Sequence, residues 1–248
     1  MQRFFIEPWQ LDEPQHLIHI KGEDVNHIKN VLRMKAGEEL WVSDGEKKEY
    51  HCRIEELLPD EVLLRILYAQ EPEYELKSRI YLFQGLPKAD KMELIIQKAV
   101  ELGAFAIVPV STRRCVVKLD EQKARKKAER WQEIARSAAK QSKRLQIPQV
   151  FPVRTWKEAL ELAEDLDVVL IPYELYHGMQ KTRETLSAIR PGQSIGVLIG
   201  PEGGFEEEEV QQALERGALP VSLGRRILRT ETAGMTMLSV LMMQLEED

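Results

Sequence analysis

Residues 195–205, IGVLIGPEGGF, constrain the fold of this chain more than any other stretch. They open with an apolar run between turn residues, which predicts a short strand covered on both faces of an α/β sheet. The run stops in a turn where Pro201 fixes φ and where Gly203 and Gly204 permit backbone conformations and ligand approach that a Cβ would block. Ligands of open α/β folds bind at such carboxyl strand ends. Two interpretations stay open: a ligand site, or a plain connection into a helix over residues 206–216 that begins with acids.

A second glycine turn follows in residues 221–233, VSLGRRILRTETA. Residues 221–223 predict the end of another strand, Gly224 a turn, and Thr230 the cap of a final helix. Three cations lie between them: Arg225, Arg226 and Arg229. The two turns are about twenty residues apart, which is enough chain for one βαβ unit. Together they favour a ligand site over a plain turn.

The remaining layout predicts one small and one large domain in the 248 residues. Short strand patterns and a hairpin turn at Asp44-Gly45 predict a small barrel. A polar, proline-containing stretch at residues 71–77 predicts the boundary, which gives domains 1–72 and 73–248. Beyond it, strands alternate with helices, which predicts an α/β domain with a mainly parallel sheet and helices on both faces. The expected strands are 3–7, 17–20, 39–43, 48–55, 61–68, 80–84, 106–110, 168–171, 195–199 and 220–223, and the expected helices are 22–33, 89–102, 120–144, 156–166, 179–188, 206–216 and 231–245.

Charge is distributed unevenly along the chain. The formal net charge is −6, yet residues 111–144 carry twelve Lys or Arg against four Asp or Glu. Such a run is usually a solvated face. Here Trp131, Ile134, Ala135 and Ala138 keep an apolar side of the predicted helix. The cations expected to form a separate basic stripe, suited to an RNA backbone, are Arg136, Lys140, Lys143 and Arg144.

Several classes of protein are excluded by what the sequence lacks. No run approaches the roughly eighteen apolar residues of a membrane helix, and charged residues interrupt the first twenty, so we expect a cytoplasmic protein. Cys52 and Cys115 lack zinc spacing, and the histidines lack metal-ligand spacing, so we expect no metal. Neither a dinucleotide fingerprint nor a Walker motif is present.

The pair LIGPEGGF and SLGRRILRTETA resembles the C-terminal signature of a known family. That family is the bacterial small-subunit (16S) ribosomal RNA uridine-N3 methyltransferases, of the SPOUT class. The resemblance extends over nearly the whole chain. It includes RFF at residues 3–5, VLR at 31–33, KMELIIQKAVELG at 91–103, PVSTRR at 109–114 and AAKQSKRLQIP at 138–148.

This resemblance implies a C-terminal trefoil-knotted sheet that binds S-adenosylmethionine in a cleft, and a small N-terminal PUA-like β-barrel that binds RNA. It also implies a homodimer acting on 16S ribosomal RNA of the small ribosomal subunit. The final helix, apolar around most of its circumference, fits burial on several sides. The cofactor role is carried onto Leu198, Gly200, Glu202, Gly203, Leu223, Gly224, Ile227 and Leu228. For the leucines, plain core packing is the alternative, and residues 171–174 are a further candidate wall.

Methylation of N3 requires a weakly acidic imide to lose a proton and attack a methyl group in line. Positioning and a nearby cation suffice for that chemistry, without a metal. Arg229 is the candidate catalytic cation because it precedes a helix in the ligand-facing loop; a surface or salt-bridged arginine is the alternative. Candidates for RNA phosphate outside the basic helix are Arg3, Arg33, Arg113 and Arg114.

The sequence therefore predicts an S-adenosylmethionine-dependent methyltransferase acting on N3 of a uridine in 16S ribosomal RNA. Two alternatives stay open. One is the same chemistry on another RNA, and the other is a non-catalytic RNA-binding or ribosome-assembly protein whose glycine turns are only structural. The residues do not identify the nucleotide or the proton acceptor.

Overall fold

The computed structural model describes residues 1–72, 75–173 and 178–246. The chain divides into two compact units. The first contains Met1–Glu75 together with Ala139–Ile147, and the second contains Leu76–Ala138 together with Pro148–Asp248. The sequence placed residues 139–147 in the larger domain, whereas they group with the smaller one. No helix in the described part of the chain combines the length and apolar character that crossing a bilayer requires.

The first unit contains a six-stranded sheet in the order β1-β4-β5-β6-β3-β2. Its strands are β1 Arg3–Phe5, β2 Leu11–Asp12, β3 Leu17–Lys21, β4 Glu39–Ser43, β5 Glu49–Leu57 and β6 Glu61–Gln70. The hairpin at Asp44-Gly45 is confirmed, since Asp44 Oδ1 accepts three successive N–H groups, from Glu46, Lys47 and Lys48, at 2.9–3.1 Å.

The predicted small barrel is formed only in part by the described residues of this unit. The strands at the two edges, β1 and β2, have three and two residues and do not pair with each other, so the sheet is an open half-barrel. Alternate residues of the central strands, such as Leu40, Val42 and Leu64, are fully buried in one core. The helix expected over 22–33 is shorter: α1 spans Glu23–Asn26, and a π-helical turn, η2, follows at His27–Val31.

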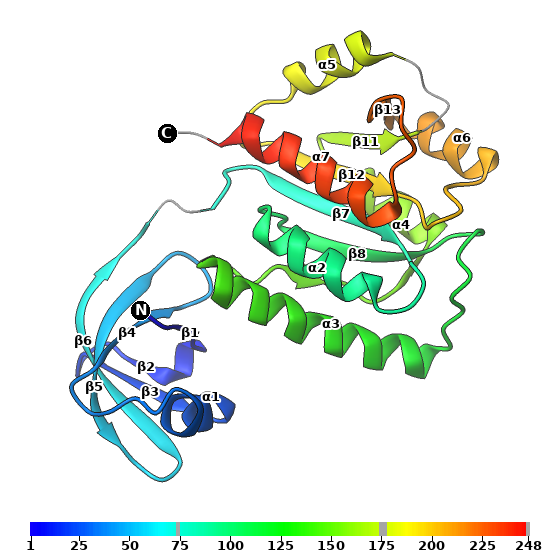
Figure 1. Ribbon diagram of the computed structural model, residues 1–248. Coiled ribbons are helices and arrows are strands. Elements are labelled where there is room, and N and C mark those ends of the chain that lie inside the picture. The colour runs from blue at the N-terminus through cyan, green and yellow to red at the C-terminus, as the bar shows by residue number, and fades with distance from the viewer. Residues whose placement is uncertain (73–74, 174–177, 247–248) are drawn as a thin grey trace. The chain divides into compact units, whose positions relative to one another are not determined.

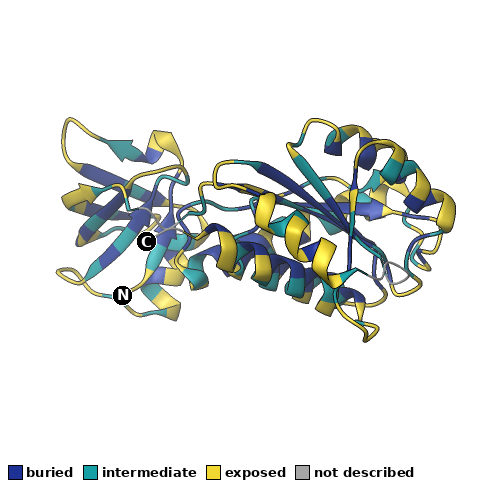
Figure 2. Cartoon of the chain, turned by 90° about the horizontal axis from the view of Figure 1, so that it is seen from above, coloured by how far each residue is buried: buried dark blue, intermediate teal, exposed yellow. Residues whose placement is uncertain are grey.

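The second unit contains a sheet in the order β10-β8-β7-β12-β11-β13, with β9 also paired to β8 (Figure 1). Every pairing in it is parallel, as the alternation of strands and helices predicts. Its strands are β7 Arg79–Gly85, β8 Ala106–Ser111, β9 Gln149–Val150, β10 Arg154–Thr155, β11 Val168–Pro172, β12 Ser194–Ile199 and β13 Leu219–Val221. The two-residue strands β9 and β10 are too short to leave a pattern in the sequence. Strand β12 lies in the middle of the sheet, and all six of its residues are buried. Figure 2 shows that strands are largely buried, whereas many helix residues are exposed.

Helices cover both faces of this sheet. They are α2 Lys91–Glu101, α3 Glu121–Ser142, α4 Trp156–Ala163, α5 Met179–Ala188, α6 Glu207–Glu215 and α7 Thr230–Leu245. Leu82 and Ile199 lie against Gly234 of α7, whereas Phe83 and Leu198 pack in the core formed with α4 and α6. Helix α7 also packs on α2, yet it leaves Met243 77% exposed, so it is buried on fewer sides than its composition predicts.

The predicted basic stripe on α3 is not formed. The helix ends at Ser142, Lys143 follows with a φ of +61°, and the buried Arg144 binds Glu75. Lys140 Nζ lies 2.8 Å from Asp24 Oδ1, and Arg136 is part-buried beside Glu133. The expected stripe is wrong because residues 139–147 group with the first unit, where Asp24 binds Lys140 and Glu75 binds Arg144, while Lys143 stays exposed.

Replacing Arg144 by alanine should destabilise the protein by about 2–3 kcal/mol, because it leaves the carboxylate of Glu75 without its charged partner. The effect falls below that of a fully buried pair, since Glu75 is 18% exposed and still accepts N–H groups from Leu145 and Gln146. Urea denaturation measures the difference. Lys143→Ala, at an exposed position, is the matched control and should stay within about 0.5 kcal/mol of the parent. Equal effects of the two substitutions would contradict this assignment.

Candidate functional site

The turn after β12 is held by close backbone contacts. A Cβ on Gly200 would lie 2.9 Å from the carbonyl carbon of Gly204, and a Cβ on Gly85 would lie 2.6 Å from Pro201 N. The N–H of Gly204 donates to Pro201 O at 2.9 Å. A Cβ on Gly203 would meet the side chain of Arg114 at 3.2 Å, and one on Gly204 would meet nothing within 4 Å. The tightest positions are therefore Gly85 and Gly200. Gly204, with a φ of +70°, has the left-handed conformation that the sequence predicted a glycine to permit there, and ligand approach at Gly203 and Gly204 stays a prediction.

The second loop, residues 222–229, runs from β13 to α7 and is anchored at both ends. Near its start, Ser222 N donates to the hydroxyl of Thr182 on α5 at 2.9 Å, and Gly224 has a φ of +102°. At its end, the hydroxyl of Thr230 donates to Gly200 O at 2.6 Å and accepts from Gln84 Nε2 at 2.8 Å. These last two bonds join the start of α7 to the ends of β12 and β7.

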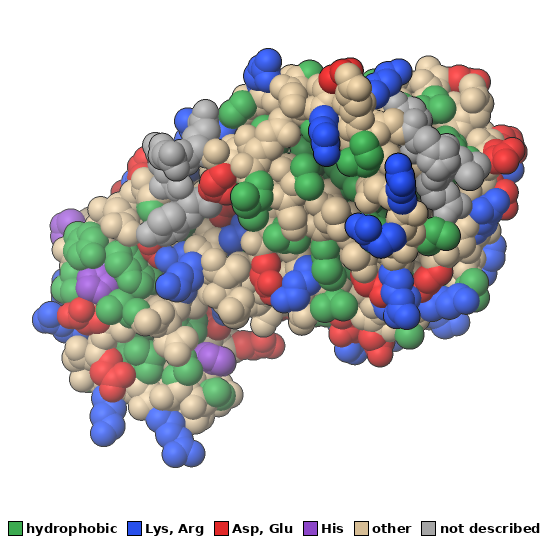
Figure 3. All heavy atoms as spheres, turned by 45° about the horizontal axis from the view of Figure 1, so that its top comes forward, with side chains coloured by type: hydrophobic (Ala, Val, Ile, Leu, Met, Phe, Trp, Pro, Cys, Tyr) green, Lys and Arg blue, Asp and Glu red, His purple; other side chains and the backbone are tan. Residues whose placement is uncertain are grey.

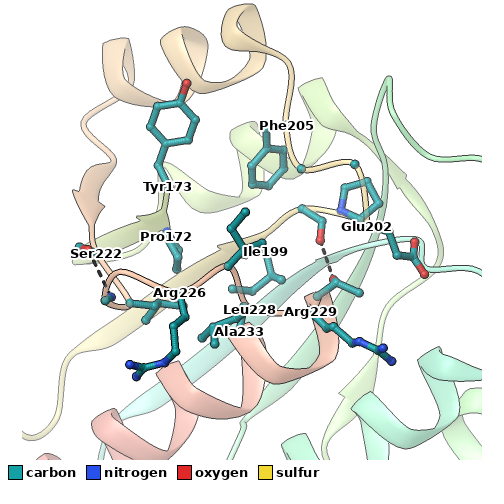
Figure 4. Close-up of a pocket in the computed structure, with 18 of the residues that line it drawn as sticks. Pro172, Tyr173, Ile199, Glu202, Phe205, Ser222, Arg226, Leu228, Arg229 and Ala233 are labelled. Atoms are coloured by element: carbon teal, nitrogen blue, oxygen red, sulfur yellow. Dashed lines mark hydrogen bonds between the residues drawn. The ribbon is translucent and has the colours of Figure 1, made fainter. Parts of the chain in front are cut away.

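The turn and the loop enclose a cavity of about 580 Å³ (Figure 4). That volume lies within the roughly 300–1,000 Å³ of small-molecule sites. Apolar walls come from Pro172, Ile199, Phe205, Leu228 and Ala233. The ionisable residues of the lining, apart from Tyr173, are four cations and one carboxylate: Lys91, Arg225, Arg226, Arg229 and Glu202. The cavity therefore suits a ligand that is partly apolar and carries negative charge.

The loop also contains backbone N–H groups without a partner in the described part of the chain. The N–H groups of Leu223 and of residues 225–229 make no hydrogen bond with any described residue. The side chains of Arg225, Arg226 and Arg229 are exposed and likewise form no hydrogen bond or ion pair within the described residues. Figure 3 shows Lys and Arg side chains gathered beside apolar ones on the visible face of the second unit.

Lys91 and Glu202 form an ion pair at the edge of the cavity, with Lys91 Nζ 3.0 Å from Glu202 Oε1. The hydrogen bond that the ammonium of Lys91 donates to Glu202 raises the pKa of Lys91. Burial alone would raise the pKa of Glu202, but N–H groups, including that of Lys88, and the ammonium of Lys91 outweigh it and hold that pKa below its usual value. Both groups are therefore charged near neutral pH.

Most of the predicted cofactor residues line the cavity. They are Gly200, Glu202, Gly203, Leu223, Gly224, Ile227 and Leu228, together with the candidate cation Arg229. Leu198 does not line the cavity. It is fully buried in the core with α4 and α6, so the alternative role of the leucines, core packing, applies to it. Of residues 171–174, Pro172 and Tyr173 line the cavity, Ile171 is buried in the same core, and Glu174 lies outside the described residues.

The candidate RNA residues are more dispersed. Arg113 pairs with Glu208 and Arg114 binds both Gly203 O and Glu206, so these arginines hold the turn and the start of α6. Arg3 is buried against Glu49, whereas Arg33 is exposed with a φ of +55°. No group of three His, Cys, Asp or Glu side chains suited to a metal occurs in the described ranges.

Four residues that line the cavity were not predicted from the sequence: Lys91, Phe205, Ser222 and Ala233. The sequence also did not predict that Thr230 bonds to both Gly200 and Gln84. Lys91 begins the helix in KMELIIQKAVELG, a segment that the resemblance included without giving it a role. Its place in the site depends on β7 and β12 being neighbours, since this pairing brings α2 beside the turn.

Comparison with known proteins identifies a class. The family model described as "RNA methyltransferase domain" matches residues 74–242, and that described as "RNA methyltransferase PUA domain" matches residues 20–67. The chain is 39% identical to ribosomal RNA small subunit methyltransferase E of Bacillus subtilis over 99% of its length and 98% of the relative's. It is 31% identical to the protein of that name in Mesomycoplasma hyopneumoniae, covering 96% and 98% of the two chains.

Solved structures agree with this class. A ribosomal RNA small subunit methyltransferase E from Neisseria gonorrhoeae, bound to S-adenosylmethionine, superposes with a TM-score of 0.83 at 35% identity over 96% of each chain. A Legionella pneumophila protein in complex with the same cofactor gives a TM-score of 0.86 at 35% identity, again over 96% of each. The chain therefore belongs to the RNA methyltransferase family that includes ribosomal RNA small subunit methyltransferase E.

Alanine substitutions at two glycines should change stability in opposite directions, because one glycine is closely packed and the other has room for a methyl group. Gly85→Ala should destabilise the protein by roughly 1–3 kcal/mol, because its Cβ would overlap Pro201. Gly234→Ala should stabilise it by about 0.5–1 kcal/mol, because it lies inside α7 and its Cβ would make ordinary contacts at 3.6 Å or more. Urea denaturation of both variants tests the pair, and a tolerated alanine at position 85 would show that the turn can move.

Proposed function

We propose that the protein transfers a methyl group from S-adenosylmethionine to N3 of a uridine in 16S ribosomal RNA. One observation supports this most: two glycine turns, joined through the Thr230 hydroxyl, enclose a cavity with apolar walls and an excess of cations. A methyl donor with an adenine ring and an aminoacyl end needs apolar and polar surfaces of this kind, and RNA brings negative charge.

The residues of the cavity fit this cofactor. Leu223 and Leu228 would contact the adenine ring, and the unpaired N–H groups of residues 225–229 would bind its edge or the carboxylate. When bound there, the cofactor supplies an electrophilic methyl group. The protein's own contribution is to align the base, exclude water and stabilise negative charge.

We propose Arg229, which lines the cavity, as the cation of this reaction. Its guanidinium lies in the loop just before α7, and it extends to the same side of the cavity as Glu202 (Figure 4). A cation there stabilises the anion that forms as N3 loses its proton. The proposal has three further features. Residues 222–229 form a trefoil knot with the turn that follows β12, and domain 1–72 binds RNA as a PUA-like domain. A homodimer covers Met243 of α7.

Among the RNA candidates, Arg33 and Lys143 are exposed and we propose them as phosphate contacts. Arg136, Lys140, Arg113 and Arg114 would have to leave carboxylate partners to take that role, and the buried Arg3 and Arg144 are better explained as structural.

Incubating the protein with labelled S-adenosylmethionine and undermethylated 16S ribosomal RNA, free or in small-subunit particles, should yield labelled 3-methyluridine. Nucleoside mapping identifies the product. Label in transfer RNA or in the large subunit would favour the same chemistry on another RNA. Absence of saturable cofactor binding by calorimetry would instead favour a non-catalytic RNA-binding or assembly protein.

Arg229→Ala should lower the single-turnover rate on the order of a hundredfold at saturating RNA and cofactor, because a preorganised charge is lost from the transition state. Arg229→Lys should recover only part of the rate, since an ammonium lacks the planar donor fork. Arg216→Ala, whose side chain binds Glu164 outside the cavity, is the control and should keep the parent rate. Rates within about twofold of the parent for both Arg229 variants would leave Arg229 as a structural or RNA-positioning residue.

A further inference from the structure

Three charged side chains from separate elements meet at the edge of the cavity, and the proposed reaction uses none of them directly. Lys91 begins α2, Glu202 lies in the turn after β12, and Glu231 is in the first turn of α7. The ammonium of Lys91 lies 3.0 Å from Glu202 Oε1 and 3.5 Å from Glu231 Oε2. Lys91 is therefore fixed between two carboxylates on different elements.

Lys91 still has donor capacity for a ligand. An ammonium group carries three N–H donors, and the two carboxylates occupy at most two of them. Its side chain is 32% exposed and lines the cavity. The cation is thus held in place and remains accessible, which is the condition for stabilising a charge that develops on a bound substrate.

Structural support of the turn does not account for the whole arrangement. Glu231 Oε2 is buried and lacks a hydrogen-bond partner among the described residues, so its contact with Lys91 is mainly electrostatic. Two negative groups facing one ammonium keep Lys91 protonated, and the raised pKa of Lys91 agrees with this. A lysine that is protonated near neutral pH cannot accept the imide proton, but it can donate a hydrogen bond to an anion.

We propose that Lys91 is a catalytic residue that donates a hydrogen bond to a carbonyl oxygen of the target uracil, while Glu202 and Glu231 position its ammonium group. This inference rests on the proposed function, because it assumes that uracil N3 is the nucleophile.

Lys91 keeps its proton throughout the methyl transfer. The N3–H bond breaks and its proton passes to water. The N3 electron pair forms the new bond to the methyl carbon, and the carbon–sulfur bond breaks with its electrons staying on sulfur. The negative charge of the deprotonated imide is shared by its two carbonyl oxygens, and a fixed ammonium beside one of them lowers the cost of losing the proton.

The test replaces Lys91 by methionine, which keeps much of the side-chain length and removes the charge. Single-turnover methyl transfer is measured at saturating RNA and cofactor, on 16S ribosomal RNA transcribed with either uridine or 5-fluorouridine. The fluorine makes N3–H more acidic, so the anion needs less help from a cation. We expect Lys91→Met to lose on the order of a hundredfold in rate on the uridine RNA and less than about tenfold on the 5-fluorouridine RNA.

Raising the pH should reduce the deficit of Lys91→Met in the same way, because more of the uracil is then ionised in solution. Calorimetry should give a dissociation constant for S-adenosylmethionine within about threefold of the parent. Lys91→Arg, which keeps the charge, should recover part of the rate. Lys98→Met is the matched control, because Lys98 lies on the same helix and binds Glu101 outside the cavity; it should behave as the parent.

A deficit of equal size on both RNAs and at all pH values would overturn the proposal and make Lys91 a clamp for the turn. So would a loss of cofactor affinity large enough to account for the rate. If the parent protein forms 3-methyluridine, these outcomes concern Lys91 alone. If the parent methylates another nucleoside or does not transfer the label, the proposed function fails and the role of Lys91 fails with it.

Discussion

The hydroxyl of Thr230 makes the contact on which the site depends. It is buried, donates to Gly200 O and accepts from Gln84 Nε2, and so joins β7, β12 and α7, which are distant in the sequence. A buried carbonyl or amide left without a partner costs about 1–3 kcal/mol, so each of these groups holds the others in place. The turn that follows β12 and the loop that precedes α7 therefore form one structure, and a ligand that orders either of them orders both.

The features that could be predicted from the sequence are those that depend on neighbouring residues in the chain. The apolar run and the glycine and proline residues after it identified β12 and its turn, and the cations before Thr230 marked the second loop. The resemblance assigned Leu198 to the site, and the sequence could not correct this, because a strand buried on both faces has no polar alternation to tell one face from the other. Lys91 was missed because its position depends on β12 lying beside β7, a neighbour more than a hundred residues earlier, and the order of strands leaves no local signal.

Long-range contacts also decide which cations of the basic segment stay accessible. The basic excess in residues 111–144 indicated a surface for RNA, yet several of its cations bind acids that the fold brings from elsewhere. Arg130 lies 2.8 Å from Glu93, Lys140 binds Asp24, and Arg144 is buried with Glu75. Exposed cations that bind no acid within the described ranges also lie in the loop before α7, at Arg225, Arg226 and Arg229. Counting charges along a chain measures composition, whereas the field that a ligand meets depends on which charges remain unpaired after folding.

The division of the chain into units also has a consequence for biosynthesis. The sheet of the first unit ends at Gln70, but residues 139–147 supply the Leu145 carbonyl that the buried hydroxyl of Ser43 binds and the cation that pairs with Glu75. In the second unit, β12 enters between β7 and β11 after both have been made. As the chain leaves the ribosome, the first unit lacks these contacts until residues 139–147 have been made, and the sheet of the second unit lacks its central strand until β12 has been made. Each unit therefore lacks some of its native contacts until well after most of its strands have been synthesised.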